Sequence, residues 1–423
     1  MKRVALIYLP HPYLNQPDAQ APLGLLYLAS VLKKDYDVKL YNFACRNTHE
    51  AIAELGEHDV YGISITSLEL LQANRFAHLI KERFPGAKVI LGGPGTISDE
   101  YVDWNIIDSI CKGEGEITIL EMLRDADNNN LKKIYYGILV QDLDVIEFPS
   151  RDLIENQGGN IFAYNENYVG NGSSQILTSR GCPFKCAFCS ASYLTSKIRY
   201  RTTESVVAEI KQVISDYGIK QFRFADETFV LKKGRLKKLC EQIKSLDIIW
   251  RISTRVDIFS EETGRMLVDA GCREVSFGCE SFDDDVLKIL NKKTTAEINA
   301  RALEASHRAG LKTRCMLMIR TPGQTKDTVR LNIEWLSRVP YDIICCTTFI
   351  PIPGCDIWYH PEKYNIQILN KNLDDYNFYF FGGGGENEIK DIIKLDSMDM
   401  DELNQQTIEF RQWVKETGKI NEG

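Results

Sequence analysis

The chain has 423 residues and a formal net charge of −8 at pH 7, and 44% of its residues are hydrophobic. This composition excludes an intrinsically disordered chain. The acidic balance gives no general basic footprint for nucleic acid or an anionic membrane. The length is typical of two or three domains.

We expect neither a secretory signal peptide nor a membrane span in this sequence. The N-terminal apolar run is short, and His11 and Pro12 follow it without a small-residue cleavage site. No apolar stretch approaches the roughly 18 residues of a membrane span. Twelve cysteines without a secretory signal indicate a reducing compartment. We therefore expect a cytoplasmic protein with no membrane span.

Residues 1–140 alternate strand and helix patterns. Helices are predicted at 23–34 and 70–84, and strands at 4–9, 37–43, 59–66, 87–92 and 110–112. This alternation predicts a parallel sheet with helices on both faces, which is an α/β domain of the Rossmann-like class. Ligands of such sheets bind beyond the carboxyl ends of the strands, where Ser64, Thr66, Ser67 and the loop 92–96 are expected.

Residues 141–172 read as a linker with turn-forming glycines. Residues 173–355 return to alternating patterns, with six strand–helix units. The expected strands are 175–179, 220–225, 248–256, 273–279, 312–319 and 342–349, and the expected helices are 203–216, 234–245, 261–270, 283–290, 296–309 and 325–337. Residues 356–423 form a C-terminal extension that is mainly helical, with a helix at 399–416 capped by Asp399.

Three cysteines, Cys182, Cys186 and Cys189, follow the first strand of this second region. Three thiolates can hold three irons of a four-iron cluster and leave the fourth iron open for a cofactor. The same spacing also places the thiols on one face of a helix, which is typical of buried core cysteine, and it suits three ligands of a zinc site. Gly181 and Pro183 favour a loop, although Pro183 can also open a helix.

The cysteine pattern, with Phe188 before the last cysteine, resembles the signature of the radical S-adenosylmethionine (SAM) superfamily. This resemblance implies a [4Fe–4S] cluster held by Cys182, Cys186 and Cys189, with SAM on its open iron. It also implies a partial (βα)6 barrel of the TIM type over 173–355 and an external one-electron donor of the flavodoxin or ferredoxin type. The cofactors supply the radical chemistry, and the protein supplies their position.

The first region resembles the cobalamin-binding domain of cobalamin-dependent members of that superfamily, through the stretches 22–29, 64–67, 92–96 and 113–116. The Asp-x-His-x-x-Gly motif that coordinates cobalt from below is missing, so cobalamin is expected without a histidine lower ligand. A scaffold domain without cofactor is the alternative. The resemblance implies cobalamin contacts at Ser64, Thr66, Ser67, Gly92, Gly93, Gly95, Thr96, Gly113 and Glu114.

The resemblance also nominates SAM-binding residues at strand ends. Asp226 and Glu227 point to opposite sides, so one of them is expected to bind the SAM amine, with a helix cap as the alternative. Glu280 and Ser281 are expected at the ribose, beside Ser276, although Glu280 also suits a structural salt bridge. The strand 248–256 carries Arg251, Ser253 and Arg255 on one face, and its two cations need an anion such as the SAM carboxylate, a substrate acid or Asp257.

Two residues depart from the family pattern near the expected adenine site. Arg320 stands where glycine is usual, and Gln324 stands where glutamate is usual. Arg320 suits either contact with an acidic substrate or packing of its aliphatic stem.

The resemblance implies that the chain is a cobalamin-dependent radical SAM methyltransferase that acts on an unactivated carbon. One alternative is a non-methylating rearrangement, cyclisation or oxidation, as in the anaerobic magnesium-protoporphyrin cyclase group. An alternative of another class is a cobalamin or iron–sulfur sensor without turnover. The sequence does not reveal the substrate, which could be a small metabolite, a lipid, a tetrapyrrole, a peptide or a nucleotide. We expect a small molecule, and the sequence offers no catalytic residue and no clear nucleic-acid signal.

Overall fold

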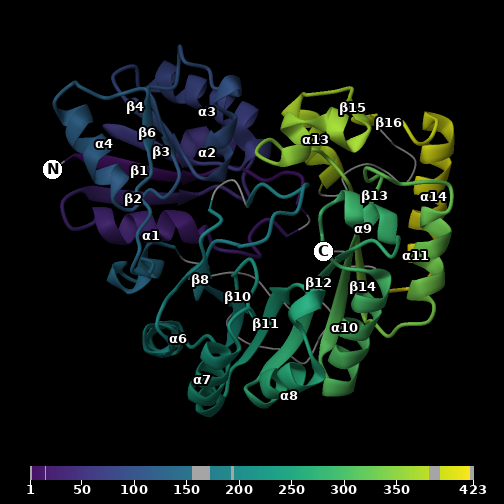
Figure 1. Ribbon diagram of the computed structural model, residues 1–423. Coiled ribbons are helices and arrows are strands. Elements are labelled where there is room, and N and C mark those ends of the chain that lie inside the picture. The colour runs from purple at the N-terminus through teal and green to yellow at the C-terminus, as the bar shows by residue number, and fades with distance from the viewer. Residues whose placement is uncertain (1, 15, 155–171, 192–194, 381–390, 420–423) are drawn as a thin grey trace. The chain divides into compact units, whose positions relative to one another are not determined.

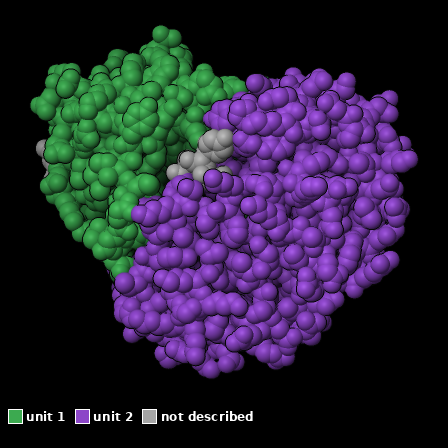
Figure 2. Space-filling model, in the orientation of Figure 1, with its two compact units in different colours: residues 1–160, 372–377 green, residues 161–371, 378–423 purple. Residues whose placement is uncertain are grey.

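The computed structural model describes residues 2–14, 16–154, 172–191, 195–380 and 391–419 (Figure 1). The chain divides into two compact units, which Figure 2 distinguishes by colour. Unit 1 comprises residues 1–160 and 372–377, and unit 2 comprises residues 161–371 and 378–423. Most of the expected linker and the glycine run 382–385 lie outside the described residues, and the domain boundaries expected near 140, 172 and 355 stay predictions.

Unit 1 contains a six-stranded parallel sheet in the order β2-β1-β3-β4-β5-β6. The order reverses between β1 and β3, which creates the switch point where ligands of open α/β sheets bind. Its strands are β1 Arg3–Tyr8, β2 Asp37–Asn42, β3 Val60–Ser64, β4 Lys88–Gly92, β5 Ser109–Lys112 and β6 Ile134–Tyr136, and its helices are α1 Leu23–Leu32, α2 Thr48–Glu54, α3 Leu70–Arg83 and α4 Thr118–Asp127.

The predicted elements of this unit are confirmed to within a few residues, and α2, α4 and β6 are additional. Buried β-branched and aliphatic residues explain the central strand, since Val4 and Ile7 of β1 are almost fully inaccessible to solvent. The short helix α2 begins with a capping box in which Asn47 and Glu50 satisfy each other's backbone amides. This pair predicts the start of α2 from the sequence.

Unit 2 contains a second parallel sheet, in the order β14-β13-β12-β11-β10-β7. The strands follow one another in chain order and the first and last are edges, so the sheet is an open, partial barrel (Figure 1). The strands are β7 Ser174–Ile176, β10 Gln221–Phe224, β11 Ile249–Thr254, β12 Cys272–Glu280, β13 Lys312–Ile319 and β14 Ile343–Thr348, and the helices are α6 Thr203–Tyr217, α7 Lys233–Ile243, α8 Glu261–Asp269, α9 Asp284–Ile289, α10 Ala296–Ala309 and α11 Thr328–Leu336.

Strand alternation separates an apolar face from a polar face in this sheet. Phe222, Trp250 and Val275 belong to one buried core with residues of the surrounding helices. The intervening residues point to the other face, where Arg251 Nη1 lies 3.3 Å from Glu274 Oε1 and Arg314 also pairs with Glu274. Glu274 is thus the anion of the described structure that balances Arg251.

The C-terminal extension contains α12 Asp356–Tyr359, β15 Ile366–Ile368, α13 Leu373–Phe380, β16 Ile393–Leu395 and α14 Met400–Glu416. The Asp399 side chain accepts a hydrogen bond from Glu402 N at 2.9 Å, which confirms the predicted cap of α14. The antiparallel pair β15–β16 is additional to the expected helices.

Arg320 and Gln324 connect the barrel to this extension. Arg320 is fully buried and adopts φ +62°, and its guanidinium donates to Asn404 Oδ1 at 2.5 Å and to Asp391 Oδ1 at 3.0 Å. Gln324 accepts from Arg320 N at 2.7 Å and donates to Gln406 Oε1 at 3.1 Å. Arg320 is therefore a structural residue, which corrects the suggestion that it reaches a substrate.

We expect Arg320→Met to lower the free energy of unfolding of the apoprotein by about 2 kcal/mol, because Asn404 and Asp391 lose the guanidinium that donates to them. Urea unfolding followed by circular dichroism measures the change. Arg330→Met is the matched control, since the Arg330 guanidinium is exposed and pairs with Glu334 on the surface. Equal unfolding midpoints for the two variants would contradict this role of Arg320.

Candidate functional site

The cysteine loop follows β7 and the short strand β8 Ser179–Arg180, at the carboxyl end of the barrel strands. Cys182, Cys186 and Cys189 are each partly exposed. Gly181, at φ +93°, enters the loop where a Cβ would lie 2.6 Å from Lys197 O, so only glycine fits. Cys189 N donates to Cys186 O at 3.1 Å. The loop thus forms without a helical face through the three thiols.

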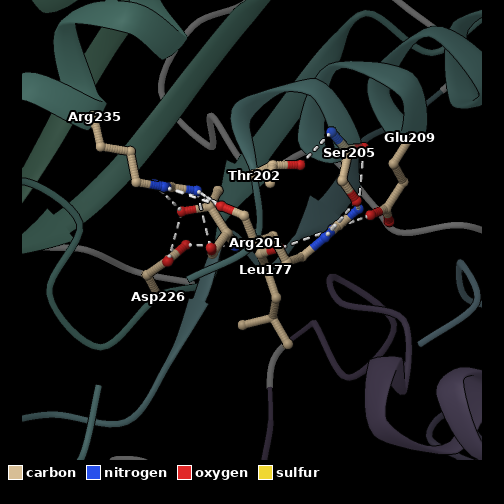
Figure 3. Close-up of polar contacts among 8 residues, drawn as sticks. Leu177, Arg201, Thr202, Ser205, Glu209, Asp226 and Arg235 are labelled. Atoms are coloured by element: carbon tan, nitrogen blue, oxygen red, sulfur yellow. Dashed lines mark hydrogen bonds and ion pairs between the residues drawn. The ribbon is translucent and has the colours of Figure 1, made fainter. Parts of the chain in front are cut away.

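A buried carboxylate anchors the strand that leads into this loop (Figure 3). Asp226 accepts from Thr178 N at 3.1 Å, from Thr178 Oγ1 at 2.8 Å and from Ser179 Oγ. Burial raises the pKa of Asp226, whereas these hydrogen bonds lower it. Because both of its oxygens accept hydrogen bonds from the start of the loop, Asp226 positions the loop, and this leaves the exposed Glu227 as the better candidate for the SAM amine.

Two arginines extend this network. Arg235 donates to Thr178 Oγ1 at 3.2 Å and to Thr178 O at 3.0 Å, and its Nε donates to Arg201 O at 3.1 Å. Arg201 in turn donates to Leu177 O at 2.9 Å and pairs with the buried Glu209 of α6 (Figure 3). The sequence analysis missed these residues, because α7 is rich in charged residues and Arg201 lies between β9 and α6, so their charge does not distinguish them from surface residues.

Arg255 links the cysteine loop to the strand β11. Its guanidinium forms a bidentate pair with Asp257, at 2.9 and 3.0 Å, and donates to Lys292 O at 2.6 Å. It also donates to Cys186 Sγ at 3.4 Å, and its carbon Cζ lies 3.9 Å from the Phe184 ring centroid. Of the anions considered for Arg255, Asp257 is therefore the partner within the described structure.

Glu280 forms a buried ion pair, as the structural alternative for this residue expected, although the sequence did not identify Lys292 as its partner. Its Oε1 lies 2.8 Å from Lys292 Nζ, and both side chains are almost fully buried. Glu280 itself adopts φ +64°, beside a register shift in the pairing of β12 with β13. Backbone strain of this kind persists where the surroundings enforce it, often at functional sites. Lys292 could have been suspected only from its place in the short turn after α9.

The remaining SAM candidates differ in accessibility. Glu227 is exposed, and Ser276 lies on the polar face of β12, on the same side as Glu280. Ser281 is fully buried; its Oγ donates to Asn332 Oδ1 at 3.3 Å and accepts from Asp283 N at 3.1 Å. Ser281 therefore shapes the turn after β12. Of the other candidates, Glu227 is exposed, whereas Ser276 and Glu280 are buried on the polar face of β12.

The donor set of the loop fits an iron–sulfur cluster. All twelve cysteines are free thiols. Burial raises the pKa of Cys186, and the Lys292 and Arg255 cations offset part of this rise. Within the described residues, no three His, Cys, Asp or Glu side chains converge to hold a single metal ion. Thiolates that each hold a different iron of a cluster do not need to converge in this way.

The cobalamin candidates of unit 1 share the carboxyl edge of β3, β4 and β5. Ser64 and Gly92 are register partners, Thr66 and Gly113 are exposed, and space is open beside the Gly92 Cα. A second group has internal contacts: Gly93, Gly95, Thr96, Ser67 and Glu114 pack or hydrogen-bond within the loops. The open edge and its exposed backbone fit a flat, amide-bearing ligand such as cobalamin.

His11 and Glu69 are a pair at this edge that the sequence did not connect. His11 Nδ1 lies 3.1 Å from Glu69 Oε1, and the His11 ring lies 4.5 Å from that of Tyr8. Burial lowers the pKa of His11 to about 4 and raises that of Glu69. His11 Nε2 is buried without a hydrogen-bond partner in the described structure.

Comparisons with known proteins agree with this geometry. The model of the radical SAM superfamily matches residues 176–336, and the model of the B12 binding domain matches residues 18–123. The chain is 30% identical over 381 residues to an uncharacterised methyltransferase of Pyrococcus horikoshii, covering 84% of this chain and 81% of that protein. The chain belongs to the cobalamin-binding branch of the radical SAM superfamily.

One relative of this radical SAM enzyme is named for a different activity. The anaerobic magnesium-protoporphyrin IX monomethyl ester cyclase of Rubrivivax gelatinosus is 27% identical, over 90% of this chain and 71% of its own length. Among solved structures, the methyltransferase TsrM of Kitasatospora setae, with cobalamin and a [4Fe–4S] cluster bound, matches 99% of this chain and 90% of its own at a TM-score of 0.69 and 16% identity. That match confirms the α/β architecture of both regions.

Membership of this branch confirms the cofactor prediction of a [4Fe–4S] cluster, SAM and cobalamin. No helix among the described residues is long and apolar enough to cross a membrane. The absence of a histidine lower ligand, the individual contact residues and the substrate stay predictions.

We expect Asp226→Asn to reduce the iron content of the reconstituted enzyme several-fold and to destabilise the apoprotein by about 2 kcal/mol, because the amide cannot accept from all three donors. Iron analysis and the visible absorbance of the cluster measure the first effect, and urea unfolding measures the second. Asp247→Asn is the control, since Asp247 pairs with Lys220 on the surface. Unchanged iron content in Asp226→Asn would contradict the anchoring role.

We expect His11 to stay off the cobalt, because Nε2 is buried and Nδ1 is held by Glu69. The electron paramagnetic resonance spectrum of bound cob(II)alamin should be identical in the wild type and in His11→Gln. Labelling the histidines with 15N should also leave the spectrum unchanged. Nitrogen hyperfine lines that change with the label and disappear in His11→Gln would overturn this expectation.

Proposed function

We propose that this enzyme transfers a methyl group to an unactivated carbon of a small molecule. The observation that carries the proposal is that one chain combines a cysteine loop, held at the active end of a barrel, with a B12-binding domain. The Pyrococcus horikoshii relative, which is named a methyltransferase, supports the same activity. The Rubrivivax gelatinosus cyclase keeps a non-methylating reaction as the alternative.

When bound, the cluster and SAM supply a 5′-deoxyadenosyl radical, and cobalamin supplies the methyl group. Cys182, Cys186 and Cys189 would hold three irons. Asp226 fixes the backbone that presents these thiols, while Arg255 donates to Cys186. The cations near Cys186 offset part of the rise in its pKa that burial causes.

Three residues on the same end of the barrel are proposed to bind SAM. Glu227 is exposed next to the cysteine loop and suits the SAM amine, because a carboxylate and an ammonium form a charge-assisted hydrogen bond. Glu280 can accept from ribose hydroxyls through the oxygen that does not face Lys292. Ser276 leaves room on that face. In unit 1, Ser64, Thr66, Gly92 and Gly113 are proposed to contact cobalamin.

The substrate is proposed as a small molecule, and the electron donor as a protein of the flavodoxin or ferredoxin type. Free thiols throughout the chain support a reducing compartment, for which the cytoplasm is our proposal.

Analysis of SAM fragments tests the proposed function. The enzyme is purified anaerobically after iron and cobalamin supplementation and is then reduced with dithionite in the presence of SAM. Methyl transfer predicts that both S-adenosylhomocysteine and 5′-deoxyadenosine form. Without substrate, the amount of S-adenosylhomocysteine should not exceed the amount of bound corrinoid. Cys186→Ala should abolish 5′-deoxyadenosine, because the cluster loses a ligand.

Each other outcome contradicts a specific part of the proposal. 5′-Deoxyadenosine without S-adenosylhomocysteine would favour the non-methylating reaction. Intact SAM in the presence of a reduced cluster would favour a sensor. A Cys186→Ala variant that forms 5′-deoxyadenosine at the wild-type rate would refute the cluster assignment itself.

A further inference from the structure

The outer edge of the cysteine loop carries three exposed lysines. Lys185 lies between Cys182 and Cys186, Lys288 lies in α9, and Lys293 lies in the turn after it. We propose that this lysine edge, defined as Lys185, Lys288 and Lys293, is the docking surface for an acidic one-electron donor protein of the flavodoxin or ferredoxin type. The inference depends on the cluster of the proposed function, but not on methyl transfer.

Hydrogen bonds join the chain segments that carry the three lysines. Asn291 Nδ2 donates to Lys185 O at 2.5 Å, and Ala187 N donates to Leu290 O at 2.9 Å. Asn291 N donates to Lys288 O at 3.0 Å. The turn after α9 is therefore bound directly to the cysteine loop at Leu290 and Asn291, and Lys288 and Lys293 flank this bound segment in the chain.

The same turn separates an inner lysine from the outer ones. Asn291 and Lys293 both adopt left-handed backbone conformations, at φ +52° and +56°, and they flank the buried Lys292. Lys292 Nζ reaches Glu280 on the inside, whereas Lys293 is exposed. Non-glycine residues with φ above zero are uncommon, so two of them around one lysine indicate a turn constrained by its surroundings.

The charge of the lysine edge suits an acidic partner. Among the described residues, none of its three ammonium groups forms an ion pair, although the whole chain has a net charge of −8. Exposed lysines elsewhere on the barrel do pair, such as Lys220 with Asp247 and Lys238 with Glu204. An unpaired cationic patch steers a negatively charged protein during diffusional encounter, and this effect weakens as salt screens it.

The location suits electron entry. Electron tunnelling slows steeply with distance, so a donor protein must dock where the cluster comes nearest to the surface. Lys185 is the residue directly before Cys186, a cluster ligand. In this step one electron passes from the reduced donor to the oxidised cluster, and no proton is transferred. A small, charged contact is typical of such transient redox encounters.

Charge reversal of the lysine edge tests the proposal. The triple variant Lys185→Glu, Lys288→Glu and Lys293→Glu is reconstituted with cluster and mixed with a purified, fully reduced bacterial flavodoxin. Flavin absorbance in a stopped-flow instrument gives the second-order rate of cluster reduction at low and high salt. We expect a loss of at least about tenfold at low salt and a loss of the salt dependence seen in the wild type.

A matched control carries the same charge change on the far side of the barrel helices. Lys211, Lys220 and Lys237 are exposed on α6, before β10 and on α7, and their triple exchange to glutamate should leave the rate near the wild-type value. The milder triple exchange to glutamine at the lysine edge is the second variant, in case glutamate impairs cluster assembly. Iron analysis establishes that each variant contains its cluster.

Dithionite separates this inference from the proposed function. Because dithionite needs no docking surface, its reduction of the cluster should be equal in all cluster-containing variants. Failure of SAM cleavage with dithionite in the wild type would refute the proposed function, while flavodoxin still reports on docking. Equal flavodoxin rates in the wild type and in the lysine-edge variants, or an equal loss in the control, would overturn the docking surface. Stronger binding of the wild type to an anionic vesicle or to RNA than to flavodoxin would overturn the choice of partner.

Discussion

The hydrogen bonds to the Asp226 carboxylate are the interaction on which the site depends. A fully buried carboxylate is costly unless its oxygens are satisfied, and here a backbone amide and two hydroxyl groups satisfy them. These donors come from Thr178 and Ser179, only a few residues before Cys182. A shift of Asp226, which follows β10, would therefore move the start of the cysteine loop, because the two are joined directly by hydrogen bonds.

The barrel wall adds a second constraint through charge. Arg255 and Lys292 approach Cys186, but each also pairs with a carboxylate, Asp257 or Glu280. A lone buried cation would be expensive, whereas these pairs keep the cations in place before any cofactor binds. The loop that presents the thiols is consequently positioned both by the hydrogen bonds of Asp226 and by the paired cations Arg255 and Lys292.

Periodicity in the sequence predicted most strands and helices of both units but missed α2, α4 and β6 of unit 1. The predicted elements were readable because each has one apolar face and recurs at regular spacing. The cysteine loop was equally readable, since its ligands are neighbours in the chain. Arg320, Lys292 and the His11–Glu69 pair were not readable in the same way. Arg320 meets Asn404 across 84 positions, and His11 meets Glu69 only because β1 and β3 are neighbours in the sheet. Such partners are fixed by long-range packing, which a single sequence does not contain.

The carboxyl edge of unit 1 explains how a B12-binding domain can lack the usual histidine motif. Two loops of this edge are joined mainly by backbone contacts: Ile65 N donates to Gly92 O at 2.9 Å, and Gly95 N donates to Ile65 O at 2.9 Å. A Cβ at Gly93, which adopts φ +90°, would lie 2.6 Å from Ile65 O, so the approach of the loops requires glycine. The shape of this edge is therefore set by backbone packing of β3 and β4, whereas a histidine would come from the loop after β1. The shape of the edge and the position of a histidine thus depend on different segments. The edge can therefore keep its shape while His11 pairs with Glu69.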